Sequence, residues 1–209
     1  MWNPVFTIGH STNSFERFVA LLEQHKIAVV CDVRSKPYSR MNPQFNREQL
    51  KASLAYYDIK YLFLGKELGA RPDDKSCYSD GKVQYDVLAG TELFKSGIER
   101  VATGASKYRV ALMCAEKEPL ECHRTILVSR ELHERGLAIM HILGDGKLEE
   151  HDASMKRLVS MLRIPPSDMF RPHEHVVRDA YRRQGEQIAY EEQSNNPSQY
   201  ISSSSKGFK

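Results

Sequence analysis

The feature that most constrains the fold is a regular alternation of short β-branched apolar runs with segments of helical periodicity. The first run covers residues 5–8, and it is followed by a helical pattern at 15–24 and a second run at 28–33. The alternation continues with helical patterns at 47–56, 83–103 and 119–135 and strand-like runs at 60–64, 107–113 and 137–143. Such a rhythm is typical of βαβ units. We therefore expect a three-layer, Rossmann-like α/β fold around a mostly parallel sheet of about five strands.

The pattern changes after the last predicted strand. From Glu149 it is purely helical, with an apolar stripe between Met155 and Leu162 that ends at Pro165. Because a chain of 209 residues is too short for two ordinary domains, we interpret residues 1–165 as one α/β domain that carries the site. The charged residues 166–193 predict an exposed helical extension. Residues 194–209, rich in Ser, Asn and Gln, predict a disordered tail.

Charge and cysteine content narrow the class of protein. The net charge is +3, from 30 Lys and Arg against 27 Asp and Glu, and both signs are interspersed, which argues only weakly for a nucleic-acid partner. The chain does not begin with a basic stretch and an apolar run, and it has no apolar stretch of about 18 residues, so we expect a cytoplasmic protein without a membrane partner. The four cysteines are then expected as thiols or ligands.

Reactive side chains concentrate after the strand-like run 107–113. Cys114 and Glu116 follow it, and Pro119 is well placed to begin the helix predicted at 119–135. Cys114 also has an ordinary interpretation, because free cysteines are often small core residues.

The first two turns of this helix are expected to hold Cys122, His123 and Arg124. Free backbone N–H groups and the helix dipole stabilise an anion or a thiolate at such a position. Cys122 is therefore a stronger candidate for a chemical role than Cys114.

Two further turns are expected at the same edge of the sheet, because ligands of open α/β sheets bind beyond the carboxyl ends of the strands. Gly9 in the first turn allows close backbone approach, and Asn13 with Glu16 predicts a capping box for the helix that follows. The second turn carries cations, although Asp32 and Arg34 also suit a structural ion pair. Together these turns add the candidates His10, Ser11, Asp32, Arg34, Ser35 and Ser39.

The spacing of the candidate residues argues against several well-known kinds of metal, nucleotide and phosphatase site. Cys114, Cys122 and His123 lack the paired knuckles of structural zinc sites, and adjacent Cys and His side chains on a helix point in different directions, so we predict no metal. No phosphate-loop pattern or complete dinucleotide fingerprint is present, and the sequence indicates no particular cofactor. A tyrosine-phosphatase signature also fails, because Arg124 has the wrong spacing from either cysteine.

Three blocks, at 7–11, 32–39 and 114–124, together resemble the signature blocks of the family named domain of unknown function 488. The resemblance covers about residues 5–143 and implies the α/β fold and a clustered site, but no reaction. The motif positions that it implies are His10, Ser11, Asp32, Arg34, Pro37, Ser39, Cys114, Glu116, Cys122, His123 and Arg124. One departure is Ala70, where a second glycine is expected after Gly69.

We therefore predict an enzyme that uses a thiol on a phosphate-bearing or nucleotide-like substrate. Cys114 or Cys122 is the nucleophile and His10 or His123 the base, while Glu116 serves as acid or base. Ser11, Asp32, Arg34, Ser35, Ser39 and Arg124 are expected to bind the substrate, the arginines as an anion clamp. The alternatives are a non-catalytic nucleotide- or nucleic-acid-binding module and a redox sensor in which the two thiols form a disulfide.

Overall fold

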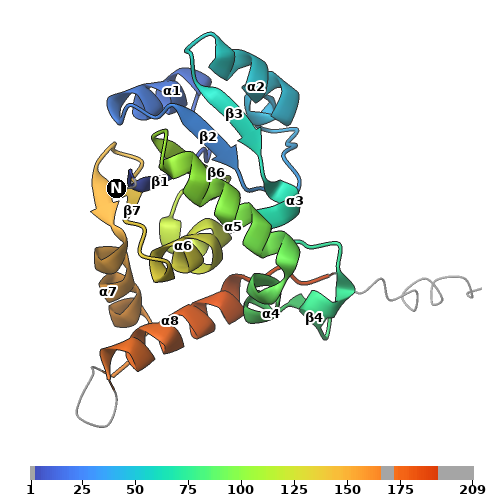
Figure 1. Cartoon of the computed structure of the whole chain (residues 1–209), viewed down its shortest axis with the longest axis vertical. Coiled ribbons are helices and arrows are strands. Elements are labelled where there is room, and N and C mark those ends of the chain that lie inside the picture. The colour runs from blue at the N-terminus through green and yellow to red at the C-terminus, as the bar shows by residue number, and fades with distance from the viewer. Residues whose placement is uncertain (1–2, 166–171, 193–209) are drawn as a thin grey trace, which may run out of the picture.

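The computed structural model describes residues 3–165 and 172–192, and its main feature is a six-stranded sheet in the order β3–β2–β6–β1–β7–β8 (Figure 1). Five strands run parallel: β1 (Val5–Gly9), β2 (Val29–Asp32), β3 (Lys60–Phe63), β6 (Val110–Cys114) and β7 (Ile139–Ile142). The edge strand β8 (Leu148–Glu150) is antiparallel to β7. The predicted mostly parallel sheet is confirmed, with one edge strand added.

Helices cover both faces of this sheet and complete three layers (Figure 1). One face packs against α1 (Phe15–Gln24) and α2 (Arg47–Ala55). The other packs against α5 (Glu92–Ala105), α6 (Arg130–Glu134), α7 (His151–Met161) and α8 (His173–Ile188). Because neighbouring strand residues point to opposite faces, Val5 joins one core cluster and Phe6 the other. The central strands are buried on both faces, as parallel strands usually are.

The prediction of one continuous helix at 83–103 is wrong, because two helices occupy this segment. A short α4 (Tyr85–Gly90) precedes α5, and Thr91 between them has extended backbone. The hydroxyl of Thr91 accepts the backbone N–H of Phe94, so Thr91 ends one helix and caps the next.

The capping box of Asn13 and Glu16 predicted for α1 is also wrong. Ser14, and not Asn13, is the N-cap of α1, because its side chain accepts the backbone N–H of Arg17. The first helix therefore starts where it was predicted, with a different cap.

The polar stretch before α4 contains regular structure of its own. A 3-10 turn, η2 (Lys75–Cys77), leads into a hairpin of β4 (Tyr78–Ser79) and β5 (Lys82–Val83). Asp80 and Gly81 join the two strands with positive φ angles of 50° and 78°, which suits a primed two-residue turn.

The chain after α8 returns to this hairpin. The backbone N–H of Val83 donates to Tyr190, and that of Glu192 donates to Gly81. The predicted tail at 194–209 lies outside the described residues, as do parts of the predicted extension at 166–193. Among the helices that the structure describes, none has the length and apolarity needed to cross a membrane.

Candidate functional site

The segment that carries the thiols is not the continuous helix predicted at 119–135. It consists of a 3-10 turn, η3 (Pro119–Glu121), a π-helical segment, η4 (Arg124–Ser129), and then α6. Cys122 lies between η3 and η4 in extended backbone, with φ −134° and ψ 137°. Its sulfur accepts the backbone N–H of Arg124 at 3.4 Å. π-helical segments are rare and often mark functional sites.

The extended backbone at Cys122 brings together three side-chain atoms that can bind a metal ion or exchange a proton. Cys114 Sγ, Cys122 Sγ and His123 Nδ1 all lie within 4.8 Å of one another, and we call these residues the thiol–imidazole cluster. His123 Nδ1 is 3.7 Å from Cys114 Sγ and 3.9 Å from Cys122 Sγ. The expectation that adjacent Cys122 and His123 point apart is therefore wrong, because it assumed helical backbone at Cys122.

The orientation of His123 is set by the turn after β2. Its Nε2 donates to the carbonyl oxygen of Val33 at 3.0 Å. In the neutral imidazole Nδ1 therefore has a free lone pair, and this lone pair faces the two sulfur atoms. The arrangement is that of a thiol, a base and a group that orients the base.

Glu116 adds a carboxylate to this cluster. The Cys122 thiol donates to Oε2 of Glu116 across 3.0 Å, which gives its proton an acceptor. Burial alone raises the pKa of Cys122, but its interactions with Cys114, Arg124 and His123 outweigh burial and hold that pKa well below the ordinary value. A negative charge is therefore favoured within the Cys122–Glu116 pair.

The negative charge near Cys122 also affects the pKa values of Cys114 and His123. Burial and the neighbouring Cys122 raise the pKa of the Cys114 thiol well above its ordinary value. Burial lowers the pKa of His123, but the hydrogen bond and charge of Cys122, together with Glu116, raise it above its ordinary value. His123 is therefore a better proton acceptor than an isolated buried imidazole.

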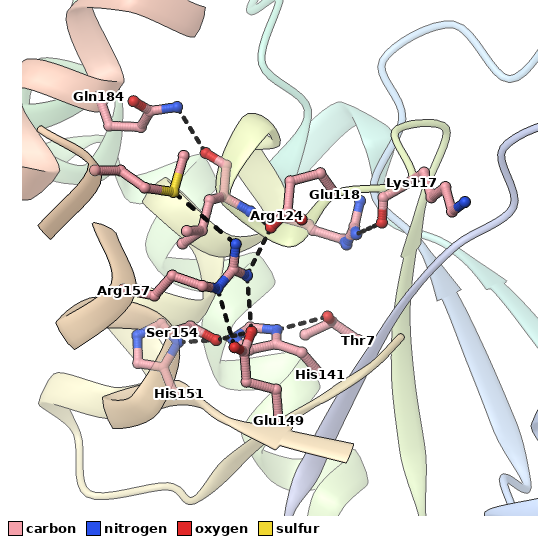
Figure 2. A network of polar contacts seen from close by, with 12 residues as sticks. Thr7, Lys117, Glu118, Arg124, His141, Glu149, His151, Ser154, Arg157 and Gln184 are labelled. Atoms are coloured by element: carbon pink, nitrogen blue, oxygen red, sulfur yellow. Dashed lines mark hydrogen bonds and ion pairs between the residues drawn. The ribbon is translucent and has the colours of Figure 1, made fainter. Parts of the chain in front are cut away.

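Arg124 supplies the matching positive charge. Its guanidinium is fully buried and donates to the carbonyl oxygens of Glu116 at 2.7 Å and Lys117 at 3.3 Å; Figure 2 shows the contact with Lys117. Its Nε has no partner in the part of the chain that the structure describes, and no described carboxylate forms an ion pair with it. Because an unbalanced buried charge is costly, Arg124 favours a negative charge on the nearby thiols.

A cleft of about 510 Å³ opens onto the cluster. Cys114, Glu116 and His123 line it, whereas Cys122 contacts Glu116 and His123 without lining the cleft itself. The cleft is also lined by the turn after β2, by Arg71, by Tyr85 at the start of α4, and by the chain at the end of α8. Cys114, which is 2% exposed, is therefore the cysteine of the cluster that borders the cleft.

Among the described residues, two cations of the cleft have no carboxylate partner. Lys36 and Arg71 are exposed and form no ion pair with any described residue. The Arg71 guanidinium lies 4.3 Å from the ring centroid of Tyr190, and the Arg71 backbone N–H donates to the hydroxyl of Ser35 at 3.0 Å. These contacts hold Arg71 at the rim of the cleft.

The positive charge of Arg34, by contrast, is already balanced by the carboxylate of Asp32. Its Nε and one terminal nitrogen donate to the two oxygens of Asp32 at 2.9 and 2.7 Å, and it also donates to the Phe45 carbonyl. Tyr61 donates to the same carboxylate. Arg34 lines the cleft, but the geometry is that of the buried structural ion pair considered for Asp32 and Arg34 in the sequence.

His10 is held by this ion pair and does not line the cleft. Arg34 donates to His10 Nε2 at 3.0 Å, and His10 Nδ1 donates to the Ser11 carbonyl at 2.9 Å, so both ring nitrogens are occupied. Burial, followed by the charge of Arg34, lowers the pKa of His10 to about 4. The ring also stacks on Phe45 at 4.3 Å. His123 is thus better placed than His10 to act as a base.

The remaining predicted binding residues occupy different places. Ser35 lines the cleft, whereas Ser11 and Ser39 do not. The Ser11 backbone N–H donates to Ala115, which ties the first turn to the thiol segment. The Ser39 hydroxyl accepts the backbone N–H groups of Met41 and Asn42 and so stabilises its own loop.

Close packing of the turns depends on Gly9, as its sequence position predicted. A Cβ atom at Gly9 would lie 1.8 Å from the carbonyl oxygen of Glu116. The missing side chain lets the turn after β1 lie directly against the loop that carries Glu116.

Sequence reasoning missed Tyr85 and Tyr190 and left Arg71 outside the site. Tyr85 is only 9% exposed, and burial raises its pKa, with Cys122 and Cys114 as further causes. Neither tyrosine belongs to a motif, so only the folded chain reveals them.

The fold and cluster define a three-layer α/β protein with a buried thiol–imidazole site at the carboxyl edge of its sheet. Residues 14–130, more than half of the chain, match the family described as "Domain of unknown function DUF488". The chain belongs to this family, as its sequence blocks predicted. No curated protein and no solved structure matches the chain.

Proposed function

We propose that the protein is a thiol-dependent enzyme that acts on a small phosphate-bearing or nucleotide-like substrate bound in the 510 Å³ cleft. The observation that carries this proposal is the position of Cys114, which faces the cleft with its sulfur 3.7 Å from His123 Nδ1. A nucleophile beside a base that a third group orients is the usual arrangement for covalent catalysis.

In the proposed reaction, the Cys114 sulfur forms a bond to the electrophilic centre of the substrate. The thiol proton passes to His123 Nδ1, and the leaving group departs with its bonding electrons. The Val33 carbonyl keeps His123 in position, and the Cys122–Glu116 pair stabilises the resulting imidazolium.

The preference for an anionic substrate rests on Lys36 and Arg71. Both cations line the cleft without a carboxylate partner among the described residues, whereas Arg34 is paired with Asp32. A phosphate group beside them gains charge-assisted hydrogen bonds. Residue-specific alkylation tests the proposal.

Metal-free protein is treated with iodoacetamide at neutral pH, and the modified cysteines are mapped by mass spectrometry. We expect Cys114 to react before Cys31 and Cys77, because all three thiols are buried but only Cys114 lines the cleft and has an imidazole beside it. Inorganic phosphate slows the reaction of Cys114 in the native protein, and it protects less in K36A/R71A. The variant C31S is the matched control and keeps the reactivity of Cys114.

Alkylation of Cys114 no faster than that of Cys31 contradicts a nucleophilic role. Equal rates with and without phosphate contradict the anionic substrate class and leave the reactivity of the thiol intact. The two parts of the proposal are therefore tested separately.

A further inference from the structure

The thiol–imidazole cluster also has the ligand set of a metal site. We propose that Cys114, Cys122 and His123 bind one thiophilic divalent ion of the zinc class. This inference does not depend on the proposed function, because it requires only the three side chains and their spacing.

The distances suit a tetrahedral ion. With Zn–S near 2.3 Å and Zn–N near 2.0–2.1 Å, tetrahedral geometry places a sulfur and a nitrogen ligand about 3.6 Å apart and two sulfur ligands about 3.8 Å apart. His123 Nδ1 lies 3.7 Å from one sulfur and 3.9 Å from the other, and all three ligand atoms lie within 4.8 Å. Binding therefore needs at most small side-chain movements.

The surroundings of His123 meet a second requirement. Histidines that bind metals usually donate their other ring nitrogen to a carbonyl or carboxylate, which fixes the ring and its tautomer. Here Nε2 donates to the Val33 carbonyl and leaves Nδ1 aimed at the two sulfurs. The ring thus already has the orientation that a metal ligand needs.

The fourth position lies on the side of the cleft. Glu116 is 3.0 Å from Cys122 and lines the cleft with Cys114 and His123, so a fourth ligand comes either from Glu116 or from the solvent and substrate space. Three protein ligands with an open position are typical of catalytic rather than structural zinc.

The ligand types select the class of ion. Two thiolates and an imidazole suit zinc and its probe cobalt, whereas Mg²⁺ and Ca²⁺ prefer oxygen ligands. The charges also balance, because two thiolates and Glu116 oppose the divalent ion and the buried Arg124. A bound ion and a reactive Cys114 are alternative states of the cluster, since the ion uses the lone pair of the sulfur.

Cobalt chloride titrated into reduced, metal-free protein tests the site through absorption. We expect a thiolate-to-cobalt charge-transfer band in the near ultraviolet and tetrahedral d–d bands in the visible region, both saturating at one ion per chain. Zinc chloride displaces the cobalt and abolishes the bands. The variants C114S, C122S and H123Q lose at least about tenfold in cobalt affinity, whereas C31S and C77S keep the native affinity.

Far-ultraviolet circular dichroism confirms that each variant is folded, and the titration of the native chain does not depend on any variant. Absence of the charge-transfer band in the native protein overturns the proposal. So does a band that persists unchanged in C114S and C122S, because the thiolates then come from elsewhere. A missing cobalt band leaves the alkylation result intact, and slow alkylation of Cys114 in metal-free protein leaves the cobalt titration intact.

Discussion

A buried histidine chain makes the stability of the fold depend on pH. Thr7 Oγ1 lies 2.8 Å from His141 Nδ1, His141 Nε2 lies 3.0 Å from His151 Nδ1, and His151 Nε2 lies 2.6 Å from the Tyr181 hydroxyl. Figure 2 shows the contacts from Thr7 through His141 to His151, beside the ion pairs of Arg157. Both imidazoles are buried. Each of the three contacts needs one proton to form a hydrogen bond, and all three form when both rings are neutral.

The size of the effect follows from His151. Burial, with the charge of His133 as a further cause, lowers the pKa of His151 from 6.5 to about 4. Because the folded-state pKa is the lower one, the stabilisation is complete above pH 6.5 and is lost as the pH falls from there towards 4. The difference between the two pKa values lowers the free energy of unfolding by about 2 kcal/mol between pH 7 and pH 5. His141 acts in the same direction, since burial lowers its pKa well below the ordinary value.

Urea unfolding at pH 7 and pH 5 measures the effect. We expect the native protein to lose about 2 kcal/mol more than the variant H151Q between these two pH values. The control H175Q replaces an exposed histidine and keeps the native pH dependence. An H151Q variant that loses as much stability as the native protein refutes the assignment of this effect to His151.

Two further predictions concern the turns around the site. D32N leaves the buried Arg34 guanidinium without its counter-charge and should lower the free energy of unfolding by about 3–5 kcal/mol, as measured in urea; a loss below about 1 kcal/mol contradicts the role given to this pair. G9A places a Cβ 1.8 Å from the Glu116 carbonyl and should destabilise the fold by at least about 1–3 kcal/mol. The matched change G104A meets only ordinary contact within α5 and should stabilise by about 0.5–1 kcal/mol. Equal thermal shifts for the two glycine variants contradict the packing argument.

The strands of this protein are predictable because burial on both faces leaves a direct signal in the sequence. The run at 28–33 contains β2, the runs at 5–8 and 107–113 each end one residue before β1 and β6 end, and their order indicates a parallel sheet. β8 is missed because three residues at an exposed edge have no periodicity of their own.

The segment 119–135 shows where local propensity fails. Its apolar spacing fits a helix throughout, but extended backbone at Cys122 and the π-helical segment η4 interrupt it. Contacts with residues outside the segment hold this geometry: Gln184 of α8 donates to the Leu120 carbonyl, as Figure 2 shows, and Arg124 donates to the Glu116 carbonyl. Such contacts override propensity and cannot be deduced from periodicity.

The site was predictable at the level of the sheet edge but not of individual roles. Topology brings the three motif turns together, as the order of the strands implies. It does not reveal that Asp32 neutralises Arg34 or that His10 has both nitrogens occupied. Arg71 and Tyr190 meet only because the chain after α8 returns to the hairpin of β4 and β5.

The most direct test of the account is the alkylation rate of Cys114 in metal-free native protein compared with the variant H123Q. Glutamine preserves a donor for the Val33 carbonyl but removes the basic Nδ1 that faces the sulfur. We expect alkylation of Cys114 to slow at least about tenfold in H123Q, because the variant lacks the base that accepts the thiol proton. An unchanged rate in a folded H123Q protein contradicts the assignment of Cys114 and His123 as nucleophile and base.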